Sequence, residues 1–222
     1  RQAAAVHKTR ANAPPHIFRD KLRMGGILWV TLHGRRQCAA AVSLFFRAMN
    51  IGMIVGRDLH EYLLAHGIVD RHLPECPDVE QKWEETAMAY LPDGIREFNE
   101  FPTASLGWMM FVGMAIAHMW DTDWQRYGGC SDLYQQLRDA RGYDCLDDHV
   151  MEDVLGLGEQ ERGTLSHIVA ECAGRALSAL LHSKAEPGTQ EAFKAYAACL
   201  KQLYLMGMAI ELKRLGYHMH KL

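Results

Sequence analysis

The chain has 222 residues, of which 49% are hydrophobic and 23% are charged, with a net charge of −3. This composition is typical of a globular protein and excludes a chain that is disordered throughout. The charge is unevenly divided: residues 1–57 carry ten Lys or Arg and one acid, whereas residues 58–222 carry 14 basic and 26 acidic residues. An acidic body repels phosphate backbones, so we expect no nucleic-acid binding by residues 58–222.

The first 57 residues form a basic N-terminal extension that differs from the rest of the chain. It is open to three interpretations: a targeting segment, a basic arm that docks on the acidic body or an anionic partner, or sequence that precedes the natural start, with Met49 or Met53 opening the folded domain. We favour the third, because helix caps and hydrophobic periodicity improve after residue 57. The predicted division is therefore an extension, 1–57, and a helical domain, 58–222.

The six cysteines contain no Cys-x-x-Cys pair, so the usual zinc-knuckle and thioredoxin-type spacings are absent. Cys172 and Cys199 lie within apolar helical patterns, and we expect both to be small core side chains. The cysteine pattern favours reduced thiols in a reducing compartment, and we predict a cytoplasmic protein.

Two helices are expected before the centre of the chain. Asp58 is predicted to cap a short helix, Leu59–His66, that Gly67 ends. Asp78 and Gln81 resemble a capping box at the start of the next helix, and Pro92-Asp93-Gly94 indicates a turn after it. The inner face of that second helix is predicted to carry Val79, Trp83, Ala87, Tyr90 and Leu91.

The most apolar stretch follows, and we predict that it forms a central helix over about 104–120. No Asp, Glu, Lys or Arg occurs from Phe101 to Trp120. Its apolar part spans only about 21 Å of helix, whereas a bilayer core needs about 30 Å. A helix that is hydrophobic on all sides is expected at the centre of a bundle, so we predict no membrane span. Gly107, Gly113 and Ala117 would let neighbouring helices approach closely.

The remaining elements are also predicted to be helical. Gly128-Gly129 breaks the chain, Ser131 caps a helix that Gly142 ends, and a further helix carries Leu146, Val150 and Val154. A long helix is expected from about Glu159 to Ser183, and Thr189 caps the last one, with Gly216 at its end. No strand or hairpin signal occurs after residue 57. The predicted fold is an all-α bundle of about six to eight helices around the central helix.

The clearest candidate site lies at the end of the central helix. His118 and Asp121 are three residues apart and share a helix face, and Asp123 lies just past the helix end. An imidazole and two carboxylates could bind a divalent metal, our only cofactor prediction. The alternative is that Asp121 and Asp123 only terminate the helix. The predicted binding residues are His118, Trp120, Asp121, Asp123, Trp124 and Glu211.

A second acidic cluster, which includes His149, follows within residues 144–153. It could complete the metal site from a facing helix through Asp147 or Asp148, or it could be a solvated helix N-terminus. Glu211 is predicted on the inner side of the last helix, with a partner from another helix rather than from Lys213 or Arg214. The predicted metal ligands are His118, Asp121, Asp123, Asp147 and Asp148.

Several catalytic motifs are absent from the sequence. It contains no HExxH, P-loop, GxSxG or Glu-x-x-His pattern. Together with the abundant Met, Trp and Tyr, this favours a binding or assembly module that self-associates as a homo-oligomer. The alternative is a metal-dependent hydrolase that acts on a phosphorylated or nucleotide-like substrate at the His/Asp site.

Overall fold

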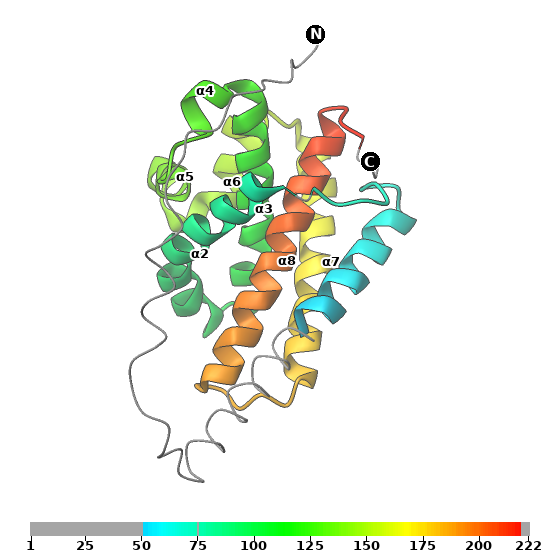
Figure 1. The fold of residues 1–222 in the computed structure, drawn as a ribbon, viewed down its shortest axis with the longest axis vertical. Helices are drawn as coiled ribbons and strands as arrows, with labels where there is room; N and C mark the ends of the chain where they lie inside the picture. Colours follow the sequence, from blue (N-terminus) through cyan, green and yellow to red (C-terminus); the bar gives the residue numbers. More distant parts are fainter. Residues whose placement is uncertain (1–50, 75, 219–222) are drawn as a thin grey trace, which may run out of the picture. The chain divides into compact units, whose positions relative to one another are not determined.

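The described regular structure is entirely helical, which confirms the all-α prediction (Figure 1). The computed structural model describes residues 51–74 and 76–218, and all of these fall within one compact unit. The predicted extension up to residue 50 lies outside the described residues. Within the described part, no helix is long and apolar enough to cross a membrane.

The first described helix covers residues 51–65, so the predicted start at Leu59 is wrong. Val55, Leu59 and Leu63 are buried at i, i+4 and i+8, and this apolar face continues N-terminally past Asp58. Packing of that face therefore extends the helix across the predicted boundary between residues 57 and 58. Gly67, at φ +67°, follows the helix end as predicted.

Helix α2, Pro77–Phe98, buries Val79, Trp83, Ala87 and Tyr90 as predicted, but it is longer than expected. Its N-cap is Cys76, and no side chain caps it, so the predicted capping box is wrong. Pro92 lies inside the helix rather than in a turn. Contacts beyond the proline offset its missing N–H: Asp93 accepts from Tyr134 and Arg138, and the Gly94 carbonyl accepts from Ser105.

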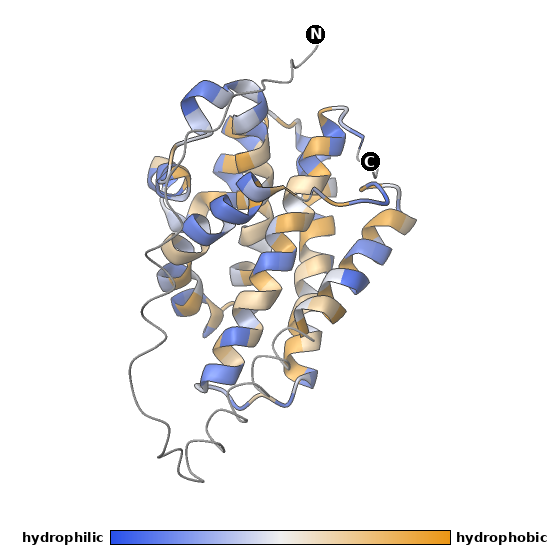
Figure 2. Ribbon diagram, viewed as in Figure 1, coloured by the Kyte–Doolittle hydropathy of each residue, from blue (hydrophilic) through white to orange (hydrophobic). Residues whose placement is uncertain are grey.

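Helix α3, Pro102–Thr122, is the predicted central helix, extended by two residues at each end. It packs against α2, α7 and α8, and its side chains from Met109 to Ala117 are at most 4% exposed. Figure 2 shows hydrophobic residues along α3 and more hydrophilic residues on α4 and α2. Burial on all sides explains why this stretch carries no charged residue until Asp121.

The closest packing in the bundle lies between α3 and α8, Gln190–Arg214, which run parallel. A Cβ added at Gly113 would lie 2.3 Å from the Tyr204 carbonyl oxygen, and one at Gly207 would lie 2.1 Å from the Met110 carbonyl oxygen. A methyl group cannot fit at either distance. The close approach predicted for Gly113 is thus confirmed, and Gly207 provides the matching space on α8.

The segment between α3 and α7 is more irregular than predicted. It contains α4, Trp124–Tyr127, α5, Leu133–Arg141, the 3-10 helix η2, Tyr143–Cys145, α6, Leu146–His149, and the π-helix η3, Val150–Val154. The expected single helix through Val154 is therefore divided into the α-helix α6 and the π-helix η3, and Asp132 rather than Ser131 precedes α5. The long helix α7, Glu159–His182, and the Thr189 cap of α8 agree with prediction.

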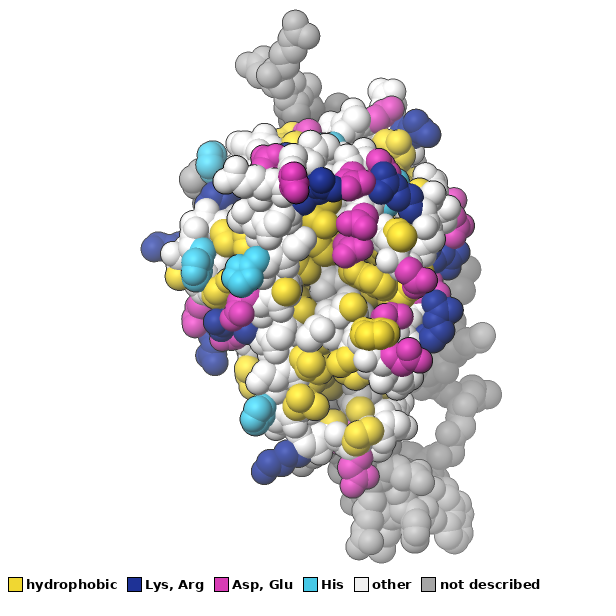
Figure 3. Space-filling view, turned by 180° about the vertical axis from the view of Figure 1, so that it is seen from behind, with side chains coloured by type: hydrophobic (Ala, Val, Ile, Leu, Met, Phe, Trp, Pro, Cys, Tyr) yellow, Lys and Arg dark blue, Asp and Glu magenta, His cyan; other side chains and the backbone are white. Residues whose placement is uncertain are grey.

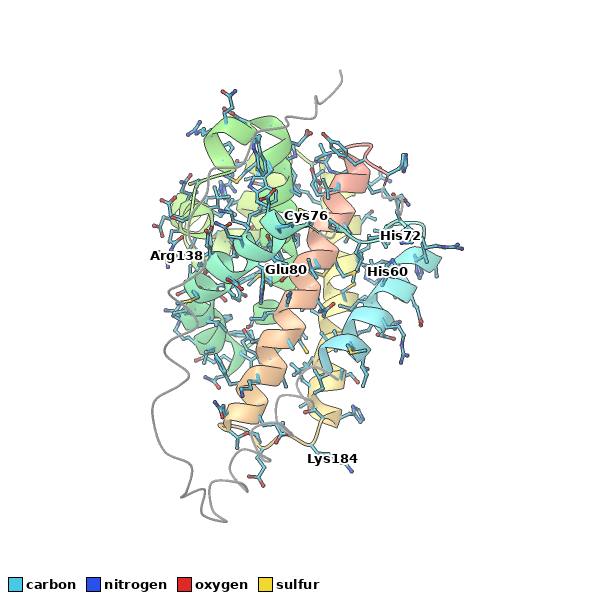
Figure 4. The ribbon with its side chains drawn as sticks, viewed as in Figure 1. His60, His72, Cys76, Glu80, Arg138 and Lys184 are labelled. Carbon is cyan, nitrogen blue, oxygen red and sulfur yellow. The ribbon has the colours of Figure 1, made fainter. Side chains whose placement is uncertain are left out.

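Ion pairs, as well as apolar packing, connect the helices. Lys201 on α8 bonds Glu80 on α2 at 2.5 Å, and Arg138 on α5 bonds Asp93 on α2 at 3.1 Å; Figure 4 labels Glu80 and Arg138. These bonds hold α2 between α5 and α8.

A buried hydroxyl network surrounds the N-terminal end of α3. The Ser105 hydroxyl bonds the Gly94 carbonyl at 2.8 Å and the Tyr196 hydroxyl at 2.6 Å, and the Tyr90 hydroxyl donates to the Ser105 carbonyl at 2.5 Å. Ser105 and Tyr90 are fully buried. The network lets polar groups enter the core because each of these hydroxyls has a partner.

Candidate functional site

The opposite, C-terminal end of α3 borders a cavity of about 320 Å³. Residues of α3, α4, α5, α6 and η3 line this cavity, which is open to solvent. This volume is at the lower end of those found for small-molecule sites. The lining residues are His118, Met119, Thr122, Tyr127, Gln136, Leu137, His149, Asp153 and Val154.

One wall carries His118, which is fixed from behind by α8. Its Nδ1 lies 2.8 Å from Oε1 of Glu211, a carboxylate that is only 1% exposed. Arg214 donates to both oxygens of Glu211, at 2.7 and 2.8 Å. Since Glu211 engages Nδ1, the free ring nitrogen of His118 is Nε2. His118, Glu211 and Arg214 therefore form one hydrogen-bonded triad, which we call triad 1.

The partners of Glu211 agree with prediction in part. A partner from another helix was expected, and His118 on α3 is that partner. The expectation that Arg214 could not share the face of Glu211 is wrong, because residues three apart on a helix are neighbours.

A second histidine of the cavity lining, His149, belongs to a similar triad. His149 Nδ1 lies 2.8 Å from Oδ2 of Asp153, four residues later, and Arg141 on α5 donates to Oδ1 of Asp153 at 2.7 Å. The free ring nitrogen of His149 is again Nε2. We call His149, Asp153 and Arg141 triad 2. Two imidazoles thus line one cavity, each held at Nδ1 by a carboxylate that an arginine also binds.

The π-helix η3 carries the carboxylate of triad 2. The Leu155 amide donates to the Val150 carbonyl at 2.9 Å, five residues back, and the Leu157 amide reaches the Met151 carbonyl at 2.9 Å. π-helical turns are rare and occur frequently at functional sites. Here the wider turn places Asp153 between His149 and Arg141.

Charged neighbours keep the acids around triad 2 ionised. The hydrogen bond from His149 lowers the pKa of Asp153, and Arg141 lowers it further. Arg141 also bonds Glu152 at 2.7 Å, and this bond lowers the pKa of Glu152, which Arg162 on α7 contacts as well. In triad 1, the hydrogen bonds from Glu211 raise the pKa of Arg214. All three arginines are therefore matched by carboxylates.

The remaining predicted site residues do not join the cavity lining. Asp121 accepts a bond from the Tyr217 hydroxyl at 2.6 Å, and Asp123 caps α4 by accepting from the Arg126 amide. Asp147 accepts from the amide of Asp148, its neighbour on α6. Within residues 51–74 and 76–218, no three His, Cys, Asp or Glu side chains come together as a metal site would require. The structure thus does not assemble the predicted metal ligands.

The two predicted tryptophans pack on each other rather than on the cavity. The rings of Trp120 and Trp124 meet edge to face at 5.2 Å, and Trp124 is 51% exposed. Of the predicted binding residues, the structure brings together His118 and Glu211.

Sequence reasoning missed Arg141 and Arg214 as parts of the site, and it placed His149 and Asp153 only within the second acidic cluster. The spacing of His149 and Asp153 at i, i+4 was a usable signal, as was that of Glu211 and Arg214 at i, i+3. Arg141 had none, because it reaches Asp153 only through the tertiary packing of α5 against η3.

Fold and site together define an all-α protein whose central helix ends at a cavity with two histidine–carboxylate–arginine triads. Comparison of the chain with protein-family models, curated proteins and solved structures found no match.

Proposed function

We propose that this protein binds a small polar ligand in the cavity at the C-terminal end of α3, and that His118 and His149 recognise it. The observation that supports this is a pair of triads whose histidines line one cavity. Both imidazoles line the cavity and are partly exposed, His118 to 25% and His149 to 14%. Each has its Nδ1 held by a carboxylate, and its Nε2 has no hydrogen-bond partner among the described residues.

The triads also suit the site to proton transfer. A carboxylate at Nδ1 orients an imidazole and selects its tautomer, which leaves Nε2 to accept a proton from a ligand or, once protonated, to donate one. Glu211 and Asp153 are positioning residues in this arrangement. The sequence-based hydrolase hypothesis is retained in that form, with acid–base chemistry by the two imidazoles in place of the predicted metal.

A thermal-shift screen tests the proposal. Small phosphates, nucleotides, carboxylates, amines and sugars would be added at millimolar concentration to the full chain, since a ligand that binds the native state raises the unfolding midpoint. We expect one chemical class to stabilise the protein, and the stabilisation to disappear in His118→Asn and His149→Asn. Asparagine keeps a nitrogen near the Nδ1 position but removes Nε2.

A matched control is His182→Asn. His182 is an exposed helix histidine whose Nδ1 also has a partner, the Ser178 carbonyl at 2.7 Å, but it lies outside the cavity. This variant should keep the full response to the ligand. A response that survives in both cavity variants would refute the proposal, as would the absence of any response across the panel.

Self-association remains a second candidate, favoured by the exposed apolar side chains. Met53 is 70% exposed, Met88 78% and Leu181 74%, and Figure 3 shows hydrophobic side chains gathered down the middle of one face. Large apolar groups on a surface often mark contacts between proteins. Size-exclusion chromatography with light scattering tests this: a dimer or larger assembly is expected, and a strict monomer at high concentration would argue against it.

A further inference from the structure

Helix α4 differs from the other elements that line the cavity, because the core does not anchor it. None of its four residues is buried, whereas α3, α5, α6 and η3 each place side chains in the core. It lies at the end of the bundle, past α3 (Figure 1). Tyr127 lines the cavity, and Trp124 is 51% exposed. Segments with few buried contacts open at a low cost in free energy, so α4 is the part of the cavity lining that can move most readily.

Both ends of α4 are suited to a hinge. At the first end, the Asp123 carboxylate accepts from the Arg126 amide at 3.1 Å, and at the second end Gly128 and Gly129 follow the helix directly. A Cβ added at Gly129 would meet no atom within 4 Å, so the surrounding structure does not hold this residue in place. Glycine adopts backbone conformations that other residues avoid, and hinges are formed by a few such residues at the ends of elements.

The observed position of α4 leaves one polar group next to it without a partner. The Trp120 ring packs edge to face on the ring of Trp124, and its indole N–H is buried with no hydrogen-bond partner among the described residues. Buried donors are normally paired, and an unpaired one destabilises the arrangement that buries it. The unpaired donor therefore favours a second position of α4, in which the Trp124 ring moves away and water or protein reaches this N–H.

Helices α4 and α6 carry complementary charges that have no ionic partner in the structure. The exposed Arg126 of α4 stacks on the Tyr127 ring, 4.9 Å from its centroid, and forms no ion pair within residues 51–74 and 76–218. The exposed Asp148 of α6 likewise forms no ion pair in that part of the chain. The two helices line the same cavity, α4 through Tyr127 and α6 through His149. A turn of α4 toward α6 would therefore let the two charges meet.

We propose that α4 is a lid, which turns about Asp123 and the two glycines to cover the cavity and is latched there by an ion pair between Arg126 and Asp148. This inference rests on the ligand site proposed above and adds how that site closes. The acids of η3 do not compete for the latch, because arginines of α5 and α7 already bind them. The closed lid carries Tyr127 over the cavity and separates its contents from bulk water, which strengthens polar contacts inside.

Labelling of the cavity histidines with diethyl pyrocarbonate tests the lid without a ligand. The reagent acylates imidazole nitrogens that it can reach, so its rates at His118 and His149 report access to the cavity, and His182, outside the cavity, is the internal reference. The rates would be measured by mass spectrometry on the full chain at one pH and one ionic strength. Arg126→Glu removes the latch, and we expect both cavity rates to rise about two- to fivefold, the range for one exposed ion pair, while His182 stays unchanged.

A charge exchange identifies the latch partners. Asp148→Lys should raise the cavity rates as Arg126→Glu does, and the double variant, which restores an opposite pair, should return them to those of the unmodified chain. Arg57→Glu is the matched control: Arg57 is exposed on the first described helix, outside the cavity, and its replacement makes the same change in charge. This control should leave the rates unchanged.

Three results would overturn the lid: unchanged rates in Arg126→Glu, a double variant that labels as fast as the single variants, or no labelling of either cavity histidine in any variant. Because no ligand enters this experiment, such a failure leaves the ligand site to be judged by the thermal-shift screen. A screen that finds no ligand would in turn remove the proposed function without changing the labelling pattern.

Discussion

The two ends of α3 bring polar groups into the same bundle in opposite ways. At the N-terminal end, Ser105 and its tyrosine partners bond to one another in a fully buried cluster. At the C-terminal end, His118 bonds to buried Glu211 on one side and faces a cavity on the other. A polar group whose bonds are completed by the protein supports the fold, whereas one with an unused position at a cavity is available to a ligand.

The largest effect is expected at alkaline pH, where the tyrosines at the N-terminal end of α3 should lower the stability of the fold. Burial raises the pKa of Tyr90 well above its usual value, and it also raises those of Tyr196 and Tyr143. A raised pKa in the native state means that the stabilisation is complete below about pH 10 and is lost as pH rises further. We expect the free energy of unfolding to fall by up to about 1.4 kcal/mol per pH unit for each tyrosine.

Urea denaturation between about pH 8 and 11, with tyrosinate absorbance at 295 nm, measures this loss. The buried tyrosines should ionise together with unfolding. Early ionisation without loss of structure would contradict the account of the N-terminal end.

The next largest effect is expected at the glycine contact between α3 and α8, midway along α3. Gly207→Ala should destabilise the protein by about 3 kcal/mol, because its methyl group would meet the Met110 backbone and separate α3 from α8. Gly174→Ala on α7 is the matched control: it has open space around it and should stabilise by up to about 1 kcal/mol. Chemical denaturation compares them, and equal effects would show that the crossing is looser than described.

Removing the central hydroxyl of the N-terminal network should have a smaller effect. Ser105→Ala leaves the Gly94 carbonyl and the Tyr196 hydroxyl without this partner, and should cost about 1–3 kcal/mol. The cavity lies at the other end of α3, so ligand binding should be unchanged. A weakened ligand response in this variant, measured below its unfolding transition, would break the distinction between the ends.

The smallest effect on stability is expected at the cavity. His118→Asn should change the free energy of unfolding by less than about 1 kcal/mol, because its ring is 25% exposed and asparagine keeps an amide near Glu211. Urea denaturation measures this change. A loss of several kcal/mol would mean that His118 serves the fold rather than a ligand.

Much of the fold could be predicted because its signals are local. The apolar run of α3, the Thr189 cap of α8 and the glycine at residue 216 depend on nearby residues alone. Pro92 inside α2 could not be predicted, since bonds from Ser105, Tyr134 and Arg138 hold the helix together around it. The sequence around Pro92 therefore could not show by itself that the helix continues, because the residues that hold it together lie far away in the chain.

The candidate site was predicted at the end of α3 that borders the cavity, but most of the residues that line this cavity were not among the predicted site residues. Acidic residues close in sequence suggested a metal, whereas the structure uses acids that meet a histidine on the same helical face or from another helix. Glu211 meets His118 across 93 positions, and Arg141 meets Asp153 through a π-helix that no sequence pattern indicated.

The two cysteines predicted to lie in the core could be recognised from their apolar surroundings. Cys172 and Cys199 are fully buried, and burial raises the pKa of each to about 12.

The most direct test of the account is a crossed comparison of His118→Asn and Ser105→Ala. Both variants would be measured for urea stability and for the midpoint shift caused by the compound that most stabilises the unmodified chain in the ligand screen. The account predicts that His118→Asn loses the ligand shift and keeps its stability, while Ser105→Ala loses stability and keeps the ligand shift. If both variants lose the same property, or if the pattern is reversed, the two ends of α3 do not have the separate roles described.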